Sequence, residues 1–102
     1  MLPEEINKRL LTQQLYIDGE PGYNQAADFS CADLCGCTQF KGCNLGGAVF
    51  SGADLEGVSF EGCCLDDVDF SYANLKGANL CNTTFSGTLF DGANVEGIIV
   101  LI

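Results

Sequence analysis

Cysteine is the residue type in this chain with the widest capacity for chemistry. Seven cysteines occur among 102 residues, and four of them share one short segment: Cys31, Cys35, Cys37 and Cys43. Thiolates bind zinc and enter redox reactions, but the C-x3-C-x-C spacing differs from that of a usual zinc finger. We therefore predict no metal and no cofactor. A redox or metal-binding module built on the surface thiols of Cys31, Cys35 and Cys37 remains an alternative function.

The same cysteines indicate the redox environment and thus the cellular compartment of the protein. An odd number cannot pair completely within one chain, so we predict free thiols in a reducing cytoplasm. The first residues, MLPEEINKRLL, place acids where a secretory signal has a basic stretch. No apolar run approaches the roughly 20 residues that cross a bilayer, so no membrane partner is expected.

The remaining composition excludes most catalytic classes. The chain has no His, which removes the commonest general base and any Ser-His triad. Fourteen acids against four bases give a net charge of −10, which argues against direct nucleic-acid binding. We predict that the protein is not an enzyme.

The dominant pattern is a repeat of five residues. From Ala27 onward, Phe, Leu or Val occupies the third place of fifteen consecutive blocks, a small or β-branched residue occupies the first place, and Gly often occupies the fifth. Side chains two apart on extended chain point the same way, so the first and third places can face one interior. Gly suits the turn that must follow, because it tolerates positive φ.

A longer period of twenty residues arranges these blocks into coils. Two columns then form the predicted core ladder, one of Phe and one of Leu or Val: Phe29, Phe50, Phe70 and Phe90, with Leu34, Leu55, Leu75 and Val95. The columns stay in phase only if one extra residue between Leu34 and Phe40 is an insertion. We predict a bulge at Cys37, with Gly36 and Thr38 as alternatives.

Blocks such as ADLEG, ANLKG, ANLCN and ANVEG resemble the pentapeptide-repeat family over residues 27–102. The resemblance implies an all-β solenoid, a right-handed quadrilateral parallel β-helix, here of about four coils. A short N-terminal helix is also similar to small cyanobacterial members. The family further implies a non-enzymatic protein-interaction or scaffold module in a bacterial cytoplasm, with an unknown protein partner.

Both ends of such a stack need covering. Residues 1–26 are predicted to be a capping helix and connector, with a helix over 3–16 whose apolar side holds Ile6 and Leu10, with Leu11 and Leu15 as further candidates. The other end finishes as GIIVLI and predicts a homodimer interface: Ile98, Ile99, Val100, Leu101 and Ile102. Alternatively, this tail folds back over the last coil.

An acidic face is the last candidate site. Seven acids map to two adjacent sides of the predicted coils: Asp28, Asp33, Asp54, Glu56, Asp69, Asp91 and Glu96. They are expected to form a solvated surface. The resemblance implies an alternative, because the quinolone-resistance members imitate duplex DNA and bind DNA gyrase. This chain is about half their length and lacks their C-terminal dimerisation helix.

Overall fold

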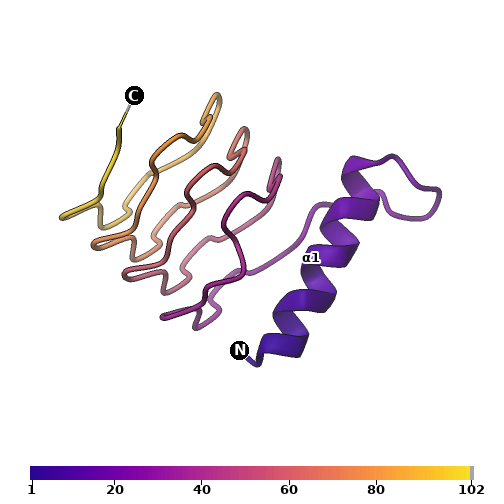
Figure 1. Cartoon of the computed structure of the whole chain (residues 1–102), viewed down its shortest axis with the longest axis horizontal. Helices are drawn as coiled ribbons and strands as arrows, with labels where there is room; N and C mark the ends of the chain where they lie inside the picture. The colour runs from indigo at the N-terminus through magenta and orange to yellow at the C-terminus, as the bar shows by residue number, and fades with distance from the viewer. Residues whose placement is uncertain (102) are drawn as a thin grey trace.

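The computed structural model describes residues 1–101 and contains one helix followed by a coiled chain. Helix α1 (Pro3–Ile17) has Pro3 in its first turn with Glu4 and Glu5 beside it, which suits the positive end of the helix dipole. In Figure 1, α1 lies beside the first coil, and successive coils stack away from it until the C-terminus. The molecule measures 39 × 28 × 22 Å. Among the described residues, no helix has the length and apolarity needed to cross a membrane.

The coils pair in parallel at a spacing of twenty residues. Val49 pairs with Asp69, and Asp69 in turn with Leu89. The Asp69 N–H donates to the Ala48 carbonyl at 3.1 Å, and the Phe50 N–H donates to the Asp69 carbonyl at 2.8 Å. This repeated register makes residues 28–101 a β-helix solenoid.

The pairing consists of single bridged residues, and residues 1–101 contain no continuous strand. This differs in detail from the expected all-β structure. The physical reason is the block length, because two of every five residues form a turn. The fifth residue of a block, which is the second residue of its turn, has a positive φ, as at Tyr72 (60°) and Gly92 (70°). A Cβ added at Gly92 would lie 2.5 Å from the Tyr72 ring of the preceding coil, so a side chain at this corner would have to displace that exposed ring.

The core is a double column of aromatic rings. Phe29, Phe50, Phe70 and Phe90 stack along the solenoid, with consecutive centroids 5.0, 5.4 and 5.5 Å apart. Phe40 and Phe60 form a second column whose rings meet the first edge-on, as in the 5.4 Å contact between Phe40 and Phe50. Leu34, Leu55 and Leu75 are also fully buried. These contacts hold the coils in register through offset and edge-to-face packing.

The extra residue lies one or two positions later than expected. The Cys37 N–H donates to the Leu34 carbonyl at 2.9 Å, the same bond that most first-place residues make to the carbonyl three residues earlier. Cys37 therefore takes the inward first place, and Thr38 is exposed. The bulge falls at Thr38 and Gln39, where the Gln39 Oε1 accepts from the Cys37 thiol (2.9 Å) and the Thr38 N–H (3.3 Å). The first choice, Cys37, is wrong because its N–H still makes the regular turn bond to Leu34, whereas the alternative Thr38 is part of the bulge.

Helix α1 caps the first coil through two buried side chains, Ile6 and Gln13. The Gln13 Oε1 accepts from the Ala27 N–H at 2.7 Å, and its Nε2 donates to the carbonyls of Gly46 (3.0 Å) and Asn44 (3.3 Å). In later coils the equivalent carbonyls accept from the coil beneath. One glutamine thus satisfies two carbonyls that pair with a lower coil elsewhere in the stack, and one N–H that elsewhere pairs with the preceding turn.

The apolar side of α1 is narrower than predicted. Leu10 is partly buried against the core, but Leu11 is 61% exposed and does not belong to that side. The buried positions Ile6 and Gln13, with Leu10 between them, follow an i, i+4, i+7 spacing. Gln13 occupies the place where the pattern calls for another apolar residue, and so the sequence did not reveal it.

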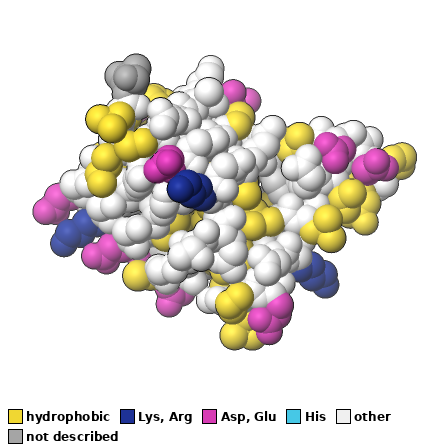
Figure 2. All heavy atoms as spheres, viewed as in Figure 1, with side chains coloured by type: hydrophobic (Ala, Val, Ile, Leu, Met, Phe, Trp, Pro, Cys, Tyr) yellow, Lys and Arg dark blue, Asp and Glu magenta, His cyan; other side chains and the backbone are white. Residues whose placement is uncertain are grey.

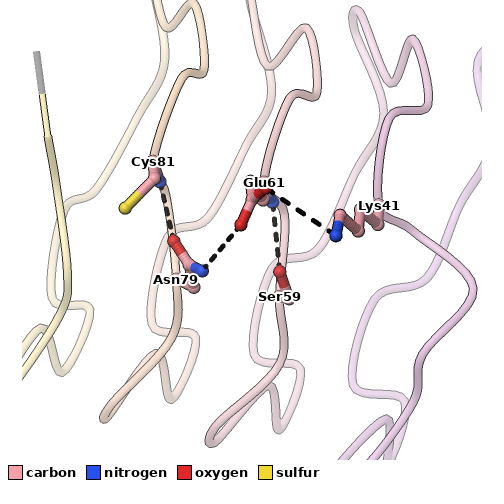
Figure 3. Close-up of polar contacts among 5 residues, drawn as sticks. All are labelled: Lys41, Ser59, Glu61, Asn79 and Cys81. Carbon is pink, nitrogen blue, oxygen red and sulfur yellow. Dashed lines mark hydrogen bonds and ion pairs between the residues drawn. The ribbon is translucent and has the colours of Figure 1, made fainter.

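Polar side chains link the coils on the outer surface (Figure 3). Lys41 lies 3.7 Å from Glu61, whose other oxygen accepts from the Asn79 Nδ2 at 3.4 Å. The Cys81 N–H donates to Asn79 Oδ1 at 2.9 Å. Both members of the ion pair are exposed, so it contributes little stability and chiefly orients side chains.

Candidate functional site

The last coil presents an open apolar cup at the end of the solenoid remote from α1. A cavity of about 310 Å³ is lined entirely by side chains of this coil and the one beneath: Leu80, Phe85, Phe90, Val95, Ile98 and Val100. Each lies at an inward place that a further coil would cover. In Figure 2, hydrophobic side chains are exposed at this end of the molecule. The arrangement provides a shaped apolar surface and no polar group that could carry a reaction.

Exposure at this end corrects one member of the predicted core ladder. Val95 lies in its predicted column, bridged through the neighbouring Asn74–Asn94 pair, but is 45% exposed. Phe90 is only partly buried. The reason is that, within residues 1–101, no coil lies over these side chains, so they have packing neighbours on one side only.

The predicted dimer end is apolar on both its inner and outer sides. Ile98 and Val100 point into the cup, with Val100 39% exposed. Outward-facing Ile99 and Leu101 are 48% and 68% exposed. Ile102 lies outside the described residues. Phe85 and Leu89 also belong to this surface, at 45% and 49% exposed, and the sequence reading missed them. Phe85 and Leu89 could have been found by asking which blocks have no described block twenty residues later to cover them.

The predicted acidic face has a structural role. Asp28, Asp33, Asp54 and Asp69 occupy second places, and each Oδ1 accepts a hydrogen bond from the N–H two residues later. Asn74 and Asn94 make the same bond. Such contacts close Asx-turns. The second-place acids therefore serve the corners of the coil, while Glu56, Asp91 and Glu96 are exposed.

Hydrogen bonding also alters the acidity of two of the chain's carboxyls. Bonds from the Ser30 hydroxyl and N–H lower the pKa of Asp28. A bond from the Ser86 N–H of the next coil lowers the pKa of Asp66. In Figure 2, acidic side chains are interspersed with Lys or Arg and uncharged groups. No continuous acidic band is visible on this face that would favour the DNA-like alternative.

All seven cysteines are free thiols, and four of them lie in surroundings that oppose ionisation. Burial raises the pKa of Cys37 and Cys43, and raises that of Cys63 to about 11. The pKa of exposed Cys35 is also raised, by desolvation and by the charge of Asp54. Because the thiolate is the reactive form, these shifts disfavour redox chemistry at these thiols.

The exposure of the predicted surface cysteines can also be compared with the structure. Cys31 and Cys35 are exposed as expected, whereas Cys37, expected among the surface thiols, is half-buried. Across residues 1–101, no group of three Cys, Asp or Glu side chains is arranged to hold a metal ion. The structure thus offers no support for the metal-binding alternative.

Comparison with known proteins agrees with this geometry. A family model for pentapeptide repeats matches residues 37–71 and 69–98, with eight copies. The chain belongs to the pentapeptide-repeat family. No curated protein sequence matches it.

Two crystal structures of pentapeptide-repeat proteins are similar to this chain. One comes from the thylakoid lumen of Arabidopsis thaliana, at 27% identity over 72% of this chain and 55% of that one, with a TM-score of 0.26. The other is HetL, involved in heterocyst differentiation regulation in the cyanobacterium Nostoc, at 24% identity over 72% and 38%, with a TM-score of 0.24. This chain thus matches only about half or less of either neighbour, and such low TM-scores say nothing about what it binds.

Proposed function

We propose that this pentapeptide-repeat protein is a non-catalytic protein-interaction module whose contact surface is the open end of its last coil. The observation that carries the proposal is the apolar cup of Leu80, Phe85, Phe90, Val95, Ile98 and Val100. An apolar surface of this kind, rimmed by exposed Leu89 and Ile99, is typical of a protein-binding site. We propose a second copy of the chain as its partner, giving a homodimer through the C-terminal coils.

We further propose the four-sided, right-handed cross-section that the family implies. Four blocks of five residues occupy each twenty-residue turn, and each block carries its own bridge and turn, which supports one block per side. A reducing bacterial cytoplasm is the proposed compartment, supported by seven free thiols of which two are exposed.

A single charge at the open end tests the proposed surface. Val95→Asp places a carboxylate in the cup, where it stays hydrated in a single chain but loses water in a dimer. We expect light scattering to give twice the mass of one chain for the natural sequence and a single-chain mass for the variant, at equal concentration.

Leu11→Asp is the matched control. Leu11 is also an exposed apolar residue, but it lies on α1 at the other end of the molecule. We expect this control to keep the mass of the natural chain. Equal masses for the two variants would contradict the proposed contact surface.

A further inference from the structure

The two ends of the solenoid differ in the backbone groups that they present. Within the stack, first-place carbonyls accept from the following coil, and third-place N–H groups donate to it, as Ala48 and Phe50 do with Asp69. The last coil has no successor within residues 1–101. Its unpartnered carbonyls belong to Thr83, Thr88, Ala93 and Ile98, and its unpartnered third-place N–H groups belong to Phe85, Phe90, Val95 and Val100.

Along its straight sides, the first three places of each block, this edge is complementary to itself when two copies run antiparallel. The fifth-place N–H groups at the corners, such as that of Gly92, lie outside this pairing and face solvent. Each second-place residue is flanked by one free carbonyl and one free N–H, and reversing the direction of a second edge places an N–H opposite every carbonyl. The interior side chains then alternate in size, because a large third-place residue faces a small first-place one. Phe90, for example, would face Ala93 of the second copy.

Head-to-tail stacking is blocked in this chain by α1. Such stacking would use the lower edge of the first coil, where the Asn44 and Gly46 carbonyls already accept from Gln13. The Asp33 carbonyl accepts from the amino group of Met1 at 2.9 Å. Only the last coil therefore remains available, and an interface using the same edge on both copies closes as a dimer.

Charge also favours a second copy at this end. The chain carries a net charge of −10 from 14 acids, but only Asp91 and Glu96 fall within residues 83–101. Two copies that meet through this end therefore bring only two carboxylate side chains from each copy near the interface.

We propose that two copies join tail to tail by antiparallel pairing of their last coils about a two-fold axis. Residues 88–90 of each copy lie along residues 95–93 of the other, and residues 83–85 lie along residues 100–98. This rests on the proposed function and specifies how its partner binds. The position of the two-fold axis follows from the shape of the upper edge of the last coil. Because the chain rises by one coil spacing in each turn, this edge is a ramp. The ramp has a step where residues 98–101 lie above the preceding turn. Two such ramps meet without a gap only when their steps abut.

Disulfide trapping tests the pairing directly. The proposal places Leu89 opposite Asn94 of the second copy as a non-hydrogen-bonded pair, with Cα atoms about 4.5 Å apart, within reach of a disulfide. Full-length Leu89→Cys and Asn94→Cys variants, each with Cys31→Ser and Cys35→Ser to remove exposed native thiols, are mixed and oxidised. We expect a linked dimer at least about tenfold above either variant alone, with mass spectrometry identifying the 89–94 linkage.

Controls separate this pairing from dimerisation in general. Asn74→Cys, one coil lower in the column of Asn94, should not link to Leu89→Cys. Thr84→Cys with Ile99→Cys probes the second pair of sides and should also link. Self-linking of Asn94→Cys at the yield of the mixture would overturn the proposed axis. A dimeric mass without linkage in either pair would overturn edge pairing and leave the proposed function standing, whereas a single-chain mass at all concentrations would overturn both.

Discussion

The Cys63 thiol shows at the scale of one residue how burial governs the chemistry of this chain. Its side chain is only 2% exposed, and its Sγ donates to the Phe40 carbonyl at 2.8 Å. The thiol therefore resists ionisation, which would leave a charge inside the core. The same burial that makes Cys63 a good packing residue makes it a poor nucleophile.

Alkaline titration should reveal this thiol. The pKa of Cys63 rises from 9.0 to about 11 on folding, so below pH 9.0 both states hold the proton and the thiol adds no pH dependence. Between these values the unfolded chain ionises first, and stability falls as pH rises. We expect Cys63→Ala to show a smaller loss of unfolding free energy than the natural chain across this window, measured by urea denaturation.

Gln13 offers a second prediction for a single side chain. Gln13→Leu leaves the Ala27 N–H and two carbonyls without their partners, at about 1–3 kcal/mol for each buried group. We expect thermal or urea unfolding to show a loss of roughly 2–4 kcal/mol, since partial rearrangement offsets part of the sum. Gln14→Leu, which removes only an exposed bond to Asp18, should change stability by less than about 0.5 kcal/mol.

The stacked Phe column sets the stability of the solenoid at the scale of its repeated element. Phe70 is fully buried between Phe50 and Phe90, so Phe70→Ala should lower the unfolding free energy by about 3–5 kcal/mol. Phe90→Ala removes a ring that is open on one side, and we expect a clearly smaller loss in a monomeric sample. Equal losses at the two positions would show that the last coil is covered.

The sequence predicted the repeated elements well and their ends poorly. The third-place columns could be read because the same inward choice recurs every five residues. The six-residue spacing from Leu34 to Phe40 indicated an insertion. The position of the insertion depended on which side chain, that of Cys37 or that of Thr38, points into the interior. The Leu34–Cys37 turn decides this, and the repeat pattern does not encode it. Gln13 escaped notice because its partners are carbonyls fixed only by the docking of α1.

The whole molecule is a stack with one closed and one open end. Because the lower edge is acceptor-rich and the upper edge donor-rich, α1 is what prevents one copy from continuing the next. We expect Ile6→Asp with Gln13→Asp to undock the helix and give assemblies larger than a dimer by light scattering, through head-to-tail contacts. Adding Val95→Asp to this variant should suppress them, whereas suppression by Leu11→Asp as well would contradict the mechanism.

The bulge at Thr38 and Gln39 carries a consequence for length variation in this chain. Here one added residue leaves the Phe40 ring against Phe29 and Phe50, so the backbone already departs from the coil without disturbing the packing. A peptide epitope inserted between Thr38 and Gln39 should therefore be exposed on the outer surface of the solenoid. The melting temperature of this variant should stay close to that of the natural chain. The same graft between Val58 and Ser59, where the ladder is unbroken, should lower it sharply. The first coil thus carries a natural insertion point, a position where new recognition loops can arise while the repeat beneath them is conserved.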